Sequence, residues 1–166
     1  MRQLQLGPIT AAAFADFGWV TPPPGPGSSP ARPINDGRCL RLDSIGELAF
    51  DAAGGRPCLA LFRASTCDPR GPWQQLERHN LGSQTFVPLG GVRYLMLVTL
   101  GALAPDPTRL AAFVVGGDQA VTLRAGTWHH GLIALDDGDF IVVERAAAEP
   151  DCELATLAEP VSLLMP

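Results

Sequence analysis

Apolar runs of strand length recur along most of this chain and are separated by turn-forming residues. The separators include Gly90-Gly91, Gly116-Gly117-Asp118 and Asp136-Asp137-Gly138-Asp139, which suit short loops between antiparallel strands. After the N-terminal region, no long segment keeps the apolar period that a helix needs. The pattern predicts an all-β antiparallel barrel or sandwich. The predicted strands are Arg56 to Ala64, Gln84 to Leu89, Val92 to Leu100, Leu110 to Val115, Ala120 to Leu123, Gly131 to Leu135 and Phe140 to Glu144.

The length and composition favour one domain. The chain has 166 residues, enough to bury a continuous core without disulfides or metals. It is 46% hydrophobic and 17% charged, with 18 Gly and 16 Pro, which fits a turn-rich β domain better than a helical bundle. We therefore expect a single domain over residues 1–166, with a central hairpin from Gln84 to Leu100 that turns at Gly90-Gly91.

The two ends of the chain carry signals of their own. Thr10 can cap a short helix from Ala11 to Phe17, which Gly18 would end. A stretch rich in Pro and Gly over residues 22–33 predicts a surface loop, because each proline removes a backbone donor. The tail from Asp151 to Pro166 is apolar enough to pack on the body or on a partner subunit.

Charge and hydropathy exclude several classes of partner. The formal net charge of −5 offers no electrostatic attraction to nucleic acid or to anionic membranes. The longest apolar stretch, Tyr94 to Ala104, is about half of the roughly twenty residues that a membrane span needs. The N-terminus lacks the pattern of a secretory signal, so a cytoplasmic location is expected. The four cysteines form no C-x-x-C pair and are expected to be reduced thiols.

The placement of the three histidines is the main functional signal. His79 lies beside one predicted strand, and His129 and His130 lie together before another. In an extended segment alternate residues share a face, so Glu77 and His79 should point the same way, whereas His129 and His130 should diverge. We expect His129 to face inward. A carboxylate beside imidazoles can either ligate a divalent metal or support proton transfer.

The spacing of these residues resembles the two motifs of the cupin superfamily. Glu77 stands where the first motif has its first His, His79 matches the second His, and Gln84 takes the place of the motif's Glu. His129 matches the His of the second motif. This resemblance implies a metal site formed by Glu77, His79, Gln84 and His129 that could hold Ni, Mn, Fe or Zn. A pocket that works without a metal, through its histidines and arginines, is an equally open alternative.

A closer resemblance covers nearly the whole chain. It is carried by L-E-R-H-x-L-G-S-Q-x-F-x-P-L at Leu76 to Leu89, W-H-H at Trp128 to His130 and D-F-I-V-V-E-R at Asp139 to Arg145. These blocks resemble the ureidoglycolate lyase family. The resemblance implies a cupin barrel, commonly a homodimer, that splits the small molecule (S)-ureidoglycolate into glyoxylate and urea in allantoin breakdown. This is a carbon–nitrogen lyase reaction of the amidine-lyase type.

The reaction needs a base for the substrate hydroxyl, an acid for the departing urea nitrogen and a cation for the carboxylate. The candidate catalytic residues are His79, His129, His130 and Glu77, and the candidate substrate-binding residues are Arg63, Arg124, Gln84 and Trp128. The chain departs from the family pattern at Asn80 and Gly131, where Pro is usual, at Thr122, where Tyr is usual, and at Glu144, where Asp is frequent.

Two other functions fit the same sequence signals. One is a cupin enzyme that acts on another small hydroxy or keto acid, because the fold alone does not select the reaction. The other is a non-catalytic barrel that binds a small acid, which would need the pocket but not a matched acid and base. The paired placement of the histidines favours an enzyme.

Overall fold

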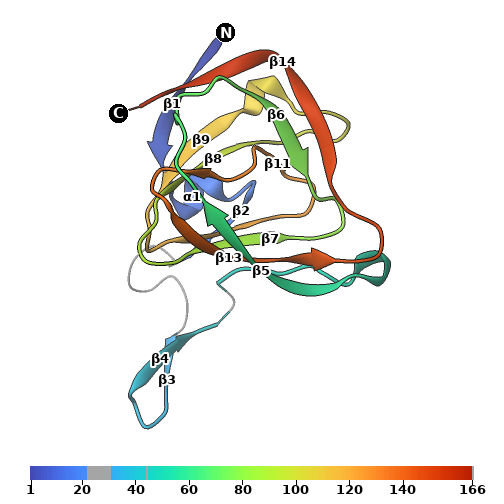
Figure 1. Cartoon of the computed structure of the whole chain (residues 1–166). Helices are drawn as coiled ribbons and strands as arrows, with labels where there is room; N and C mark the ends of the chain where they lie inside the picture. The colour runs from blue at the N-terminus through green and yellow to red at the C-terminus, as the bar shows by residue number, and fades with distance from the viewer. Residues whose placement is uncertain (22–30, 44, 166) are drawn as a thin grey trace.

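The computed structural model describes residues 1–21, 31–43 and 45–165. Strands make up most of these residues and form two large sheets and one hairpin (Figure 1). The larger sheet contains β1 (Arg2–Pro8), β6 (Trp73–Arg78), β8 (Tyr94–Thr99), β9 (Ala111–Val115), β11 (Trp128–His129), β12 (Ile133–Ala134) and β14 (Glu153–Leu164). The second contains β2 (Gly18–Thr21), β5 (Arg56–Ala64), β7 (Gln84–Pro88), β10 (Ala120–Leu123) and β13 (Gly138–Ala146). The remaining elements are α1 (Ala11–Phe14), the hairpin strands β3 (Ala31–Ile34) and β4 (Cys39–Leu42), and short 3-10 turns at Ala52–Gly54 and Pro107–Arg109.

The larger sheet closes on itself. Its order is β11-β6-β14-β1-β9-β8-β12, and β11 also pairs with β8, so the strands from β11 through β6 to β8 form a ring. The all-β class and the cupin-type barrel expected from the sequence are therefore confirmed. The pairing is antiparallel except at β1, which runs parallel to both β14 and β9. The second sheet, of order β2-β10-β7-β13-β5, packs against one wall of this barrel.

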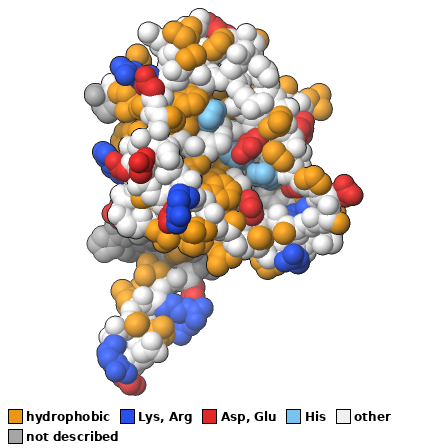
Figure 2. Space-filling model, viewed as in Figure 1, with side chains coloured by type: hydrophobic (Ala, Val, Ile, Leu, Met, Phe, Trp, Pro, Cys, Tyr) orange, Lys and Arg blue, Asp and Glu red, His pale blue; other side chains and the backbone are white. Residues whose placement is uncertain are grey.

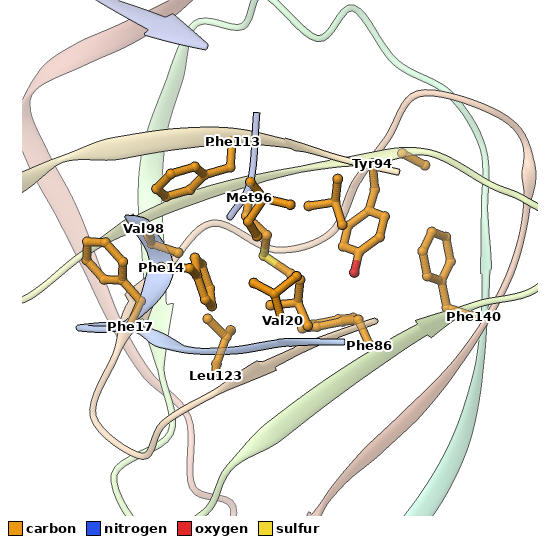
Figure 3. Close-up of a cluster of buried hydrophobic side chains, with 14 of the residues drawn as sticks. Phe14, Phe17, Val20, Phe86, Tyr94, Met96, Val98, Phe113, Leu123 and Phe140 are labelled. Atoms are coloured by element: carbon orange, nitrogen blue, oxygen red, sulfur yellow. The ribbon is translucent and has the colours of Figure 1, made fainter. Parts of the chain in front are cut away.

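Two apolar cores result, and β8 lies between them. All six of its residues are buried. Leu95 and Leu97 belong to the core inside the barrel, which we call the barrel core. Met96 and Val98 face the second sheet and belong to the sandwich core. In the sandwich core, side chains from α1, β2 and β9 meet those of β7, β8 and β13 (Figure 3).

The predicted hairpin from Gln84 to Leu100 is wrong. β7 and β8 lie in different sheets, and β7 pairs instead with β10 and β13. Gly90 and Gly91 both adopt positive φ and carry the chain from one sheet to the other. A short turn signal reports that the chain changes direction, but it does not specify which strand becomes the partner.

The remaining predictions about the chain ends are confirmed in part. Thr10 caps α1 by accepting a hydrogen bond from the Ala13 amide at 3.1 Å, although the helix ends at Phe14 rather than at Phe17. The tail forms β14, which pairs with β6 and β1, and it buries Leu157, Val161 and Leu163. This packing on the body agrees with the expectation.

The loop predicted over residues 22–33 is only partly correct. Residues 22–30 lie outside the described residues, but residues 31–33 begin strand β3. β3 pairs with β4 around a turn in which Asn35, Asp36 and Gly37 all have positive φ. The hairpin forms a separate two-stranded sheet that extends away from the body (Figure 1). Only Asn, Asp and Gly commonly adopt this left-handed conformation, which explains the turn sequence.

The structure agrees with the cysteine expectation. All four cysteines are free thiols. Among the described residues, no helix combines the length and apolar character needed to cross a membrane.

The barrel core predicts a clear contrast between two leucine substitutions. Leu97 is 0% exposed and Leu103 is 92% exposed. We expect Leu97→Ala to lower the free energy of unfolding by about 2–5 kcal/mol, because it leaves a cavity in packed surroundings. Leu103→Ala should change it by less than about 0.5 kcal/mol. Urea denaturation of both variants measures the difference, and similar losses would contradict the assignment of β8 to the core.

Candidate active site

Strand pairing places Glu77 directly opposite His129. β6 and β11 are antiparallel neighbours with His129 in register with Glu77. His79 follows the end of β6 and, by alternation, lies on the same face as Glu77. Ligating atoms of Glu77, His79 and His129 lie within 4.8 Å of one another. We call these three residues the His–Glu cluster. Figure 2 shows some histidine atoms beside acidic atoms on one face of the molecule.

Backbone carbonyls set the orientation of both histidines in the cluster. His79 Nδ1 bonds to the carbonyl oxygen of Asp151, and His129 Nδ1 bonds to that of Thr127 at 3.0 Å. A carbonyl can only accept, so Nδ1 carries the proton on each ring. In the neutral imidazoles, Nε2 therefore presents a lone pair. Neither Nε2 atom has a hydrogen-bond partner, although both are buried.

Glu77 supplies negative charge beside these lone pairs. Its Oε1 lies 3.4 Å from His129 Nε2. The His129 side chain holds the pKa of the Glu77 carboxyl below its usual value, and burial opposes this effect. The Cys152 thiol donates to Glu77 Oε2 at 3.7 Å. A carboxylate facing an unprotonated nitrogen at this distance is stabilised when a proton or a metal ion lies between them.

The second sheet contributes two residues to the opposite side of the site. Gln84 is at the start of β7 and is 5% exposed. It lies two residues before Phe86 and so shares its inward face. Glu144 lies on the inward face of β13, two residues after Val142. Gln84 Nε2 donates to Glu144 Oε2 at 2.9 Å, and Gln84 Oε1 is buried without a partner.

A cavity of about 210 Å³ opens beside the His–Glu cluster. Its lining residues include His79, Ser83, Glu144, Arg145, Asp151 and Cys152. The cavity is smaller than the pockets that hold drug-sized ligands, so it suits a small metabolite. We call it the site cavity.

His130 and Trp128 lie elsewhere. The His130 ring packs against Trp73, with 4.5 Å between ring centroids, and burial lowers its pKa. Trp128 is fully buried in the barrel core, and its Nε1 donates to the carbonyl of Gly101 at 3.0 Å. Strand alternation explains both positions, because His129 faces the cluster and its two neighbours must face away. His129 is thus the histidine that faces the cluster, as expected, and it lies on the side of the strand that faces the second sheet.

The structure does not bring Arg63 and Arg124 to the site cavity. Arg63 forms a bidentate pair with Asp139, and its side chain is 78% exposed. The Arg124 guanidinium lies over the Trp19 ring at 3.8 Å from its centroid. The cation among the residues that line the site cavity is Arg145, which donates to the carbonyls of Ala52 and Ala53.

Sequence reasoning missed several residues at the site. The sequence could have identified Glu144, because a carboxylate that continues the inward series of Phe140 and Val142 is unusual in a core. The sequence could not have identified the contact of Asp151 with His79, because Asp151 makes it through its backbone carbonyl. Its side chain also accepts from the backbone amides of Asn80 and Leu81, which fixes the loop after β6.

The fold and the site define a small-molecule-binding β-barrel with a histidine and carboxylate centre. The chain matches the family described as ureidoglycolate lyase over residues 1–164. It is 37% identical to a ureidoglycolate lyase of Azotobacter vinelandii over 99% of this chain and 98% of that protein. It is 42% identical to one from Burkholderia mallei over 87% of this chain and 84% of that protein. The chain therefore belongs to the ureidoglycolate lyase family.

Among solved structures, a dTDP sugar isomerase from Desulfovibrio desulfuricans G20 aligns with a TM-score of 0.39 at 22% identity. The alignment covers 76% of this chain and 81% of that one. This similarity is too distant to bear on the fold or the chemistry.

Proposed function

We propose that this protein is a ureidoglycolate lyase that releases glyoxylate and urea from (S)-ureidoglycolate, as a step of allantoin breakdown. Family membership and the names of the relatives support this proposal. The structural observation that supports it best is the pair of buried Nε2 atoms without hydrogen-bond partners, on His79 and His129, beside the Glu77 carboxylate. Two imidazoles close together provide a base and an acid for the same reaction.

The reaction can be assigned to these residues. The His79 ring donates only to a neutral carbonyl, so its Nε2 is available as the base that takes the substrate hydroxyl proton. The oxygen then forms the aldehyde of glyoxylate as the carbon–nitrogen bond breaks, and the bonding pair moves to nitrogen. We assign His129, whose Nε2 lies 3.4 Å from Glu77 Oε1, as the acid that gives a proton to the departing urea. No other reactant is needed.

Substrate binding is assigned to the groups around the site cavity. Arg145 lines the site cavity and is the cation we assign to the substrate carboxylate. Of the two roles expected for Gln84, we propose substrate binding, because a neutral amide oxygen is a weak ligand for a transition metal. A cupin enzyme for another hydroxy or keto acid remains the second candidate, and turnover of ureidoglycolate distinguishes the two.

Activity of the wild-type protein and three histidine variants tests the assignment. We expect release of glyoxylate and urea from (S)-ureidoglycolate, and a loss on the order of a hundredfold or more in kcat for His79→Ala and for His129→Ala. His130→Ala is the matched control, because its ring packs against Trp73. It should keep most of the activity. Equal losses in all three variants would contradict the assigned roles, and inactivity of the wild type would contradict the proposed substrate.

The His–Glu cluster also fits a divalent metal ion. Two neutral imidazoles with outward Nε2 lone pairs and one carboxylate are the donors that Ni, Mn, Fe or Zn prefers. The carbonyls bonded to Nδ1 are the outer hydrogen bonds that metal-bound histidines usually make. Such an ion, held by Glu77, His79 and His129, would polarise a bound substrate oxygen. Ligation and proton transfer use the same lone pairs, so they are alternative uses of the cluster.

Metal addition distinguishes these uses. We expect Ni²⁺ to raise the melting temperature of the wild-type protein and of His130→Ala, because an ion that binds only the folded state stabilises it. His129→Ala should show no such rise, since it removes one of the two imidazoles. Differential scanning fluorimetry with and without EDTA measures the shift. An equal rise in His129→Ala would exclude this cluster as the metal site, and activity that resists EDTA would favour proton transfer.

We propose that the protein is a cytoplasmic homodimer. The free thiols suit a reducing compartment. β5 is an edge strand, and its outward residues Leu59 and Leu61 are 70% and 55% exposed. The protruding hairpin adds Leu40, at 64% exposed. Exposed apolar groups of this kind mark interaction surfaces in soluble proteins.

Sedimentation equilibrium tests the dimer. We expect the wild-type protein to have twice the mass of one chain, and Leu59→Asp combined with Leu61→Asp to shift it towards monomer, because buried charges without partners oppose association. Leu103→Asp, on an exposed loop position, is the control. A monomeric wild type would contradict the proposal.

A further inference from the structure

One pair of residues at the site has no part in the proton transfers assigned above. Gln84 Nε2 donates to Glu144 Oε2 at 2.9 Å, and the two residues come from neighbouring strands of the second sheet. An ionised carboxylate can only accept hydrogen bonds. Glu144 therefore fixes which end of the amide faces it, and Gln84 Oε1 must face the other way.

The fixed oxygen has no partner of its own. Gln84 is 5% exposed, and its Oε1 is buried without a hydrogen bond. Leaving such an acceptor unsatisfied costs free energy, so native proteins keep few of them, and a ligand often supplies the missing donor. Glu144 lines the site cavity together with His79, so the carboxylate that holds the Gln84 amide lies at the wall of this cavity.

The unpaired atoms of the site include acceptors that lack a donor. Gln84 Oε1, His79 Nε2 and His129 Nε2 are the buried side-chain polar atoms without partners in the described part of the chain. Gln84 Oε1 is an acceptor, and His79 Nε2 is one as well because Nδ1 of that ring carries the proton, whereas His129 Nε2 faces Glu77 Oε1 at 3.4 Å. The Glu77 carboxylate adds further acceptors. A ligand that satisfies this group must be rich in donors, and a ureido group carries N–H on both of its nitrogens.

We propose that Glu144 is a positioning residue that orients the Gln84 amide, and that Gln84 Oε1 accepts an N–H of the ureido group and thereby selects ureido substrates over keto and hydroxy acids of the same shape. This inference rests on the proposed function for the identity of the substrate. A site built around an N–H donor rejects analogues that lack it, because its acceptor then stays buried and unpaired.

Binding of two unreactive ligands of matched shape tests this selection. N-carbamoylglycine has the ureido and carboxylate groups but lacks the hydroxyl, so it cannot lose urea by the assigned route. Levulinate replaces its NH₂ by CH₃ and its NH by CH₂. Isothermal titration calorimetry of the wild-type protein should give an affinity for N-carbamoylglycine that is on the order of tenfold or more above that for levulinate.

Variants of the pair identify the cause of the preference. Glu144→Gln keeps the shape but lets the Gln84 amide turn over, so the ratio of affinities should fall to about twofold or less while levulinate binding stays unchanged. The double variant Gln84→Glu with Glu144→Gln restores an oriented acceptor at position 84 and should restore the preference. Glu159→Gln removes the same charge from an exposed position and is the control. Melting temperatures verify that each variant is folded.

The outcomes separate this inference from the proposed function. A preference that persists in Glu144→Gln, or a loss of affinity for both ligands alike, would overturn the orienting role even if the wild type splits ureidoglycolate. A preference that depends on Glu144 in a protein that does not split ureidoglycolate would support ureido recognition and contradict the proposed reaction. Turnover offers a second readout, because Glu144→Gln should raise KM for ureidoglycolate more than it lowers kcat.

Discussion

The position of β11 between β6 and β8 is the constraint on which the site depends. This strand has only two residues, yet it closes the barrel and carries His129. Trp128 anchors it, since the indole is fully buried and donates to the Gly101 carbonyl. The Arg78 guanidinium lies over this ring, with 4.3 Å from its central carbon to the ring centroid. Alternation then directs His129 to the opposite side, where Glu77 lies in register. The barrel core thus determines the geometry of the His–Glu cluster.

The site occupies one end of the sandwich core, where polar residues replace apolar ones. Along β13 the inward series Phe140 and Val142 ends in Glu144, and along β7 Phe86 is preceded by Gln84. On the facing sheet, Val98 is in register with His129. Polar groups in these positions cost stability unless they are paired. The apolar remainder of the core compensates for that cost and holds the polar groups in place.

Periodicity predicted much of this arrangement. It located β5 and β10 correctly and placed Glu77 and His79 on one face, because alternation is a local property of strands. It could not predict that β7 and β8 belong to different sheets, since partner choice depends on the whole topology. The structure does not bring Arg63 and Arg124 to the site cavity, for a related reason. Arg63 finds its partner in Asp139, far along the sequence but adjacent across β5 and β13.

The unpaired polar atoms describe the chemistry of the candidate site more closely than the residue types do. A sequence shows which residues are polar, but it does not show which of their atoms are already satisfied. Carbonyl groups of Asp151 and Thr127 occupy one nitrogen of each ring and leave the other free, and Glu144 does the equivalent for the Gln84 amide. Each contact fixes the orientation of one ring or amide group. In the proposed recognition, a ureido ligand supplies the donor that the ordered Gln84 oxygen lacks.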